Sequence, residues 1–237
     1  MRSPCIKNRD TSSENYMKGL FEMNLVDVVV NAWNVGNTID LSGIGYGKIH
    51  WGNHKDIVKE PFDYYQFLSG FVASQNLKNI LEIGTHWGGS TVSIARGCAA
   101  NSRAPNARIF TIDVTDESDK WLPFQPEYRL IRKYVGDANH KPAIDAAIEF
   151  LKPDCKLDLL FIDADHSFMP SLIQYSVYST IFSPKYVILD DINLNDGMRQ
   201  LWKMLTKKMP PSDYAVANEI IPDVRGEDSG FGILISE

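Results

Sequence analysis

The stretch ILEIGTHWGGSTVSIARG, residues 80–97, joins an apolar run to a glycine-rich turn and then to a segment with helical spacing. The apolar run predicts a buried strand at 79–84, and GSTVSIARGCA predicts the helix that follows it. An acidic residue, Glu82, lies inside the apolar run, two places before Gly84. Glycines at a strand-to-helix turn let backbone N–H groups and the helix N-terminus approach a polar or anionic ligand. The stretch therefore predicts a ligand-binding βα unit, and several nucleotide chemistries use such a turn.

The same alternation of strand and helix continues along the chain. Strands are predicted at 107–114, within 128–137, at 157–165 and at 185–192, and helices at 141–151, 171–181 and 196–205. Two late strands, near 214–221 and 231–237, have no long helix between them. Continuous apolar strands that alternate with helices are typical of a parallel sheet covered on both faces. We predict a doubly wound α/β fold with a mostly parallel seven-stranded sheet, helices on both faces and an antiparallel C-terminal hairpin.

The N-terminal quarter has a different pattern. Apolar residues recur at helical spacing over 17–35, the Gly- and Asn-rich segment 36–60 is predicted to be irregular, and a helix is predicted at 61–75, near Pro61. We predict an N-terminal extension, 1–60, which contacts substrate or another subunit, and a main domain, 61–237. The helix at 17–35 could pack against a second copy of the chain.

Composition limits the classes of protein. The chain has 237 residues, 44% hydrophobic and 23% charged, which is typical of a globular protein with one α/β domain. A net charge of −6 argues against a nucleic-acid partner. Cys5, Cys98 and Cys155 lie far apart, which favours a reducing compartment. The sequence has no signal-peptide core and no run of about 18 apolar residues. We therefore predict a cytoplasmic protein with no membrane contact.

Two familiar phosphate-binding motifs fit the glycine-rich turn poorly. Gly84 and Gly89 have the spacing of a P-loop, but Ser90 stands where that motif requires lysine. A dinucleotide motif, GxGxxG, would have His86 in place of its second glycine, where a side chain hinders a pyrophosphate. That second interpretation keeps some support, because Asp113 follows at the end of the next strand, where a ribose-binding acid belongs.

The turn resembles motif I of the class I S-adenosylmethionine (SAM)-dependent methyltransferases, in which an acidic residue, one further residue and glycine precede a glycine-rich turn. That resemblance implies a Rossmann-like fold and SAM as cofactor. It also implies a set of cofactor-binding residues: Glu82, Gly84, Thr85, Gly88, Ser90, Asp113, Asp137 and Asp163. Ser90 would donate to the cofactor's carboxylate, Asp113 would accept from its ribose, and Asp137 would meet its adenine. A turn-forming role is the alternative for Asp137.

Acidic side chains follow two later strands. FIDADHSF (161–168) contains Asp163, Asp165 and His166, and YVILDDIN (186–193) contains Asp190 and Asp191. Neighbouring parallel strands would bring these groups to one edge of the sheet, where several carboxylates repel one another unless a cation neutralises them. Oxygen ligands favour Mg²⁺, Mn²⁺ or Ca²⁺. The alternative is that these Asp residues cap helices or bind loop N–H groups.

These two segments resemble the metal-dependent O-methyltransferases of the catechol and caffeoyl-CoA types. The closer resemblance is to bacterial sugar- and antibiotic-modifying enzymes, of the macrocin and rhamnosyl O-methyltransferase/cephalosporin-hydroxylase-like groups. It implies that Asp163, Asp190 and Asp191 ligate a divalent metal, although plant and animal enzymes carry Asn at the position of Asp191. It implies either His166 or Asp165 as the catalytic base, and an imidazole suits that task near neutral pH.

We therefore predict a SAM- and metal-dependent O-methyltransferase that acts on a hydroxyl of a sugar or other small natural-product intermediate. The alternatives are an NAD(P)-dependent oxidoreductase and a non-catalytic binding module with the same fold. The oxidoreductase would have no need of the carboxylates, and the complete Asp cluster argues against the binding module.

Overall fold

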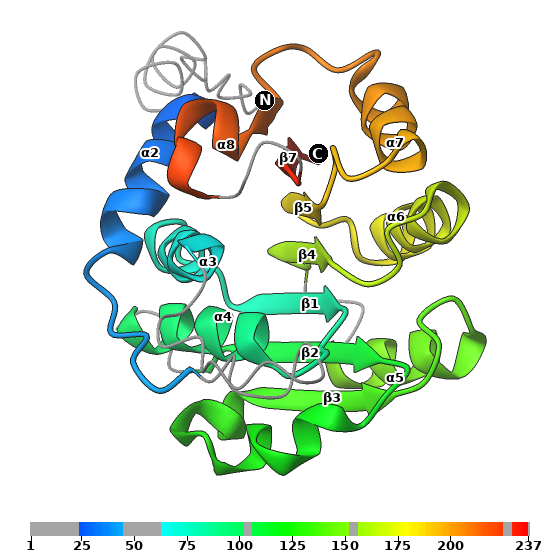
Figure 1. Ribbon diagram of the computed structural model, residues 1–237. Coiled ribbons are helices and arrows are strands. Elements are labelled where there is room, and N and C mark those ends of the chain that lie inside the picture. Colours follow the sequence, from blue (N-terminus) through cyan, green and yellow to red (C-terminus); the bar gives the residue numbers. More distant parts are fainter. Residues whose placement is uncertain (1–23, 45–62, 102–105, 152–155, 225–228, 237) are drawn as a thin grey trace, which may run out of the picture.

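The architecture is a seven-stranded mixed sheet with helices on both faces (Figure 1). The computed structural model describes residues 24–44, 63–101, 106–151, 156–224 and 229–236. The sheet order is β3-β2-β1-β4-β5-β7-β6. The strands are β1 Asn79–Ile83, β2 Arg108–Asp113, β3 Ile131–Val135, β4 Leu159–Ile162, β5 Tyr186–Asp190, β6 Tyr214–Val216 and β7 Phe231–Ile235. Strands β1 to β5 run parallel, while β7 is antiparallel to both β5 and β6. The predicted fold class is confirmed.

Helices cover the two faces of the sheet and form two cores. Helices α2 Leu25–Gly36, α3 Asp63–Ser74 and α4 Gly89–Ala100 contribute to one core, together with the short α8 Ala217–Ile220. Helices α5 Lys141–Leu151, α6 Phe168–Phe182 and α7 Asp196–Thr206 contribute to the other (Figure 1). The described residues also include four short 3₁₀ helices: η1 Glu117–Lys120, η2 Leu122–Phe124, η3 Pro126–Leu130 and η4 Pro222–Val224.

The central strands consist mainly of apolar residues because both of their faces are covered. All four residues of β4 and all five of β5 are buried, and in β1 only the first residue is partly exposed. Each fully buried aliphatic side chain in such a strand stabilises the fold by roughly 1.5–3 kcal/mol relative to an exposed one. Burial on both faces explains why these segments have no polar alternation.

Helix α2 packs its apolar side on α3 within the same chain. It begins at Leu25, where the side chain of Asn24 accepts a hydrogen bond from the N–H of Asp27, and residues 17–23 of the longer predicted helix lie outside the described residues. Val28, Val29 and Ala32 are buried in the core that α3 shares. The apolar face that suggested a subunit contact is therefore occupied within the chain, and the oligomeric state stays a prediction.

The strand predicted near 214–221 is shorter than expected. Only Tyr214–Val216 pair with β7, and the chain then turns into α8. The side chain of Asn218 accepts a hydrogen bond of 3.1 Å from the N–H of Phe231, at the start of β7. That N–H is therefore bound by a side chain of α8, and β6 does not continue alongside it.

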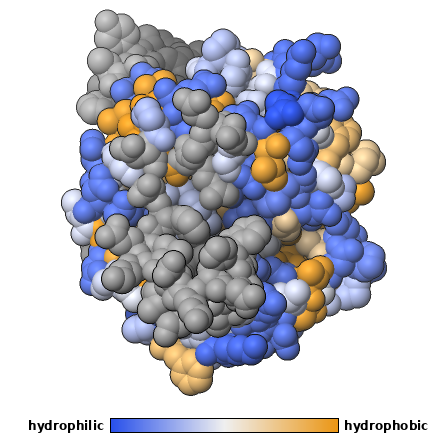
Figure 2. Space-filling view, viewed as in Figure 1, coloured by the Kyte–Doolittle hydropathy of each residue, from blue (hydrophilic) through white to orange (hydrophobic). Residues whose placement is uncertain are grey.

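The strand order reverses between the neighbours β1 and β4: β2 and β3 follow β1 towards one edge of the sheet, and β5 follows β4 towards the other. In doubly wound sheets, ligands bind at the carboxyl ends of the strands at this point. On the surface seen in Figure 2, hydrophobic residues of the described chain lie in small separate groups among hydrophilic ones. Within the described ranges, no helix is long and apolar enough to cross a membrane.

Candidate active site

A cleft of about 1240 Å³ opens at the carboxyl ends of the parallel strands. It exceeds the roughly 300–1,000 Å³ of ordinary small-molecule sites, so it has room for two ligands at once. Every parallel strand contributes through the turn that follows it. The lining includes Gly84, Thr85 and His86 after β1, Asp113 at the end of β2, Asp137, Ala138 and Asn139 after β3, Asp163, Asp165 and His166 after β4, and Asp191 and Leu194 after β5.

Gly84 is required where β1 meets β4. Its φ is +108°, and a Cβ placed there would lie 2.0 Å from the main-chain carbonyl oxygen of Asp163. The N–H of Asp163 in turn donates to the carbonyl oxygen of Ile83 at 2.8 Å. Because any other residue would push the two strand ends apart, Gly84 keeps the glycine-rich turn after β1 in direct contact with the turn after β4 that carries Asp163.

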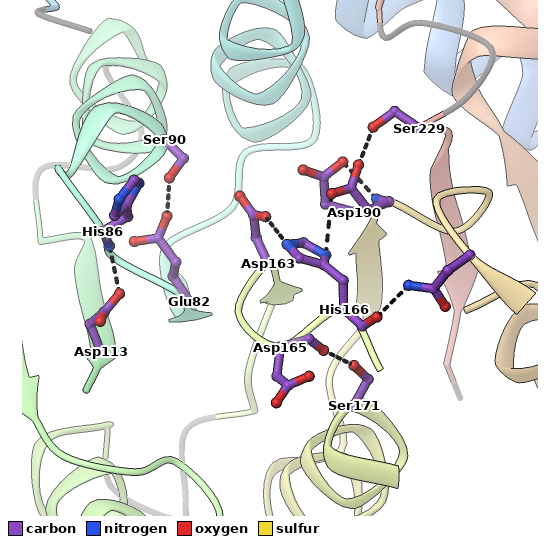
Figure 3. A network of polar contacts seen from close by, with 12 residues as sticks. Glu82, His86, Ser90, Asp113, Asp163, Asp165, His166, Ser171, Asp190 and Ser229 are labelled. Carbon is purple, nitrogen blue, oxygen red and sulfur yellow. Dashed lines mark hydrogen bonds and ion pairs between the residues drawn. The ribbon is translucent and has the colours of Figure 1, made fainter. Parts of the chain in front are cut away.

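Glu82 is completely buried behind this turn. Its carboxylate accepts a hydrogen bond of 2.6 Å from the hydroxyl of Ser90 (Figure 3). It also accepts from the hydroxyls of Thr111, at 2.7 Å, and Thr91. Burial raises the pKa of Glu82, and the three hydroxyl donors oppose that rise. Glu82 therefore acts on the cleft through the start of α4. The hydroxyl proton of Ser90 is directed to Glu82, although Ser90 lines the cleft, and the contact predicted between Ser90 and the cofactor stays a prediction.

A Glu82→Gln variant is expected to change how stability depends on pH. Because the folded pKa of Glu82 is raised above its ordinary 4.5, the folded chain holds this proton more tightly than the unfolded chain does. Stability from this group is present at low pH and is lost as the pH rises from about 4.5 through the folded pKa, by up to about 1.4 kcal/mol per pH unit. Urea unfolding from about pH 4.5 to about pH 8 should show the wild type losing stability relative to the variant. Parallel curves would contradict this assignment.

Asp113 closes the turn between β1 and α4. Its Oδ2 accepts from the N–H of His86 at 2.6 Å, and its Oδ1 accepts from the N–H of Thr115 at 2.9 Å. His86 has a φ of +46°, which side-chain-bearing residues rarely adopt, and the bond to Asp113 holds it there. The imidazole Nε2 of His86 lies 3.7 Å from Glu117 Oε2, and both residues line the cleft. His86 thus replaces the expected glycine without closing the cleft.

Asp137 forms a turn as well as lining the cleft. Its Oδ1 accepts from the N–H of Asn139 at 2.8 Å, and the Asn139 amide donates to the same oxygen at 3.1 Å. The turn-forming role that we considered for Asp137 is therefore present, and its contact with adenine stays a prediction.

His166 lies between two of the predicted metal-ligating carboxylates (Figure 3). Its Nδ1 is 3.3 Å from Asp191 Oδ2, and its Nε2 is 3.8 Å from Asp163 Oδ1. The main-chain oxygen of His166 accepts from Asn195 at 2.7 Å, which fixes the backbone. Ser229 donates its hydroxyl proton to Asp191 Oδ1. The imidazole is thus oriented by Asp191 and partly exposed to the cleft.

The remaining carboxylates do not converge on His166. Asp190 is fully buried, and its Oδ1 accepts from the N–H of Asp191 at 2.8 Å. Asp165 is exposed, and its Oδ1 accepts from the hydroxyl of Ser167. Over the ranges that the structure describes, no three His, Cys, Asp or Glu side chains are grouped as metal ligands. The expected cluster of four carboxylates is therefore divided between the cleft and the interior.

Several cleft residues carry no motif that would single them out in the sequence. Tyr65 of α3 is buried beside the turn, and a Cβ on Gly89 would lie 2.4 Å from its hydroxyl oxygen. Gln174 of α6 also lines the cleft. Both lie in helices whose apolar spacing predicts only packing, so contacts distant in sequence were needed to find them.

Comparison with known proteins agrees with this geometry. Residues 81–192 match a methyltransferase-domain family, Methyltransf_24. No curated protein sequence matches the chain significantly. Among solved structures, the O-methyltransferase TomG from Streptomyces achromogenes, in complex with SAM, is 19% identical with a TM-score of 0.53, over 98% of this chain and 100% of TomG. An O-methyltransferase from Bacillus cereus in complex with SAH is 17% identical with a TM-score of 0.51, over 95% and 97%. The methyltransferase PaMTH1 from Podospora anserina, also SAH-bound, is 15% identical with a TM-score of 0.54, over the whole of both chains.

Residues 81–192 are therefore similar to a methyltransferase domain, and the overall fold is that of the solved O-methyltransferase structures named above. The matched segment begins within β1 and ends just after Asp191, so it spans both the glycine-rich turn and the two acidic strand ends.

Proposed function

We propose that this chain transfers a methyl group from SAM to a hydroxyl of a small molecule and that His166 accepts the hydroxyl proton. The observation that carries the proposal is the position of His166, on the cleft and oriented by Asp191 through a 3.3 Å contact. A histidine held by a carboxylate and open to a cleft is the arrangement of a general base.

The cleft fits SAM at three places. The N-terminal turn of α4, with Gly89 and Ser90 in the lining, presents backbone N–H groups and a positive dipole end to the cofactor's carboxylate. Asp113 accepts from two backbone N–H groups and from the Thr115 hydroxyl, and its Oδ2 keeps a lone pair for a ribose hydroxyl. At the end formed by the turn after β3, the buried amide oxygen of Asn139 has no hydrogen-bond partner in the described structure. When bound, the cofactor supplies a methyl group on a sulfonium sulfur, which leaves as a thioether.

His166 has one nitrogen for orientation and one for the proton. If Nδ1–H donates to Asp191, the lone pair of Nε2 is directed to the cleft, because 3.8 Å from Asp163 is too long for a hydrogen bond. Nε2 then accepts the proton as the acceptor's oxygen bonds to the methyl carbon, and Asp163 and Asp191 stabilise the resulting imidazolium. Asp165 stays the alternative base and is tested separately.

A divalent cation, the other part of the prediction, does not fit the described residues as they are arranged. Carboxylate oxygens of Asp163 and Asp191 are suitable donors for Mg²⁺, yet the imidazole of His166 lies between them and Asp190 is turned inward. Titration of chelator-treated protein with MgCl₂ or MnCl₂ tests the cation: saturable binding that Asp191→Asn weakens would restore it to the site, and absence of binding would remove it.

The acceptor is proposed to be a sugar or another small natural-product intermediate, on the strength of the sequence resemblance. The volume of the cleft supports an acceptor bound beside the cofactor. Pro170 and Leu194 add apolar surface near His166, so an acceptor with both an apolar face and a free hydroxyl would suit this part of the lining. A screen of nucleotide sugars and hydroxylated aromatic compounds for methyl transfer would identify it.

Ligand-induced stabilisation tests the cofactor. At a hundredfold excess over Kd, SAM or its demethylated product S-adenosylhomocysteine should stabilise the fold by about 2.7 kcal/mol, which corresponds to roughly 5–10 °C in Tm for a chain of this size. NAD⁺ and NADH should leave Tm unchanged. A shift with NADH and none with the methionine cofactors would replace this proposal with the oxidoreductase.

A further inference from the structure

Gln174 places a buried amide on the cleft wall. The residue belongs to α6 and is only 3% exposed, and its Oε1 finds no hydrogen-bond partner among the described residues. Buried amide oxygens are nearly always paired, since leaving one unpaired costs free energy. Because Gln174 lines the cleft, a ligand in the cleft is the natural partner for its amide.

Gln174 shares a face of α6 with a residue that binds the turn after β3. Tyr178, one helical turn further along α6, donates its hydroxyl proton to the carbonyl oxygen of Ala138 at 2.8 Å. Residues four apart share one face of a helix, so the face that carries Gln174 lies against this turn. Ala138 and Asn139 belong to this turn and line one end of the cleft, and Asn139 Oδ1 is also buried without a partner.

This end is separate from the proposed proton-transfer site. His166 and its partner Asp191 follow β4 and β5, whereas the turn with Ala138 follows β3, at the far edge of the parallel strands. A nucleoside cofactor that extends from the turn after β1 past Asp113 would place its nucleobase, and not its reacting methyl group, beside Gln174.

We propose that Gln174 is a specificity-determining residue that recognises the adenine base of the cofactor. Its amide oxygen accepts from the exocyclic amino group, and its amide N–H donates to the neighbouring ring nitrogen. The pairing of one donor and one acceptor is the one by which Asn and Gln side chains recognise adenine in DNA. The inference rests on the proposed function, because it takes S-adenosylmethionine as the ligand.

The test compares S-adenosylhomocysteine with its 6-deamino analogue, which lacks the exocyclic amino group, by isothermal titration calorimetry. The wild type is expected to bind the parent compound about tenfold more tightly than the analogue. In Gln174→Met, which keeps the size of the side chain but has no amide, this preference should fall by about tenfold. Gln200→Met, the same exchange on an exposed position of α7, should leave the preference unchanged.

The outcomes separate the two proposals. If the wild type binds neither compound, the proposed function fails. If it binds the parent compound and Gln174→Met keeps the full preference, only the role of Gln174 is overturned. Should Gln174→Met not fold, Gln174→Glu keeps a similar size and an accepting oxygen. That variant should keep the preference for the amino group, and its loss would overturn the inference.

Discussion

A His166→Ala variant is expected to bind S-adenosylmethionine normally and to lose about 10²–10⁴-fold in kcat, the usual contribution of a general base. The imidazole is placed for this role by Asp191, at 3.3 Å from Nδ1, with Nε2 available to an acceptor in the cleft. Alanine removes the proton acceptor without disturbing the backbone, which Asn195 holds through the main-chain oxygen of residue 166. Single-turnover methyl transfer with saturating cofactor measures the chemical step directly.

Two further variants make the result specific. Asp165→Ala removes the alternative base, whose Oδ1 already accepts from the hydroxyl of Ser167, and should change kcat far less. His140→Ala removes an exposed imidazole that does not line the cleft and should leave kcat unchanged. If Asp165→Ala shows the large loss and His166→Ala the small one, the roles of these two residues are reversed. A preserved kcat in both would exclude either residue as the base.

An Asp113→Ala variant is expected to raise the Kd for S-adenosylhomocysteine by about 10–10²-fold. A hydrogen bond from a ribose hydroxyl to the carboxylate contributes about 1.5–3 kcal/mol, and the variant removes it. It also removes the bonds that hold the N–H groups of His86 and Thr115, so the turn after β1 loses a support. Isothermal titration calorimetry measures the Kd, and urea unfolding measures the accompanying loss of stability.

The neighbouring Asp116 provides a matched control on the same loop. Asp116→Ala makes the same change of charge at an exposed position outside the cleft lining, so the Kd should stay within about twofold of the wild type. Asp113→Asn keeps one accepting oxygen and should lie between the two. Equal affinity in Asp113→Ala and the wild type would show that the ribose contact is made elsewhere.

The sheet could be predicted from the sequence because strands buried on both faces consist of consecutive apolar residues. LLFI of β4 and YVIL of β5 are continuous apolar runs, and the helix at 141–151 matches α5 residue for residue. The end of β6 could not be predicted in this way. YAVANEII alternates well enough for a strand, but the bond between Asn218 and the N–H of Phe231 joins residues distant in sequence, and helix α8 forms there.

Some cleft residues could likewise be predicted from the sequence, and others could not. The glycine-rich turn and the carboxylates at the strand ends could be predicted from short stretches of sequence. Each of the residues concerned follows an apolar run: Gly84, Asp113, Asp163 and His166. The inward direction of Asp190 was hidden, because adjacent residues at a strand end point to different sides and only the packed structure determines which one faces the cleft. Gln174 could not be predicted as a cleft residue either, because the residues around it on α6 form an ordinary helical pattern.

The sequence by itself determined the order of strands and helices, the glycine-rich turn and the presence of acidic groups at two strand ends. These features depend on local backbone preferences and on the periodicity of burial, both of which are properties of short segments. Only the tertiary structure decided that His166 lies between Asp163 and Asp191, that Glu82 is buried among three hydroxyls, and that Tyr178 of α6 binds the turn after β3. Those relations join residues up to 40 positions apart in the chain, and packing brings them to contact distance.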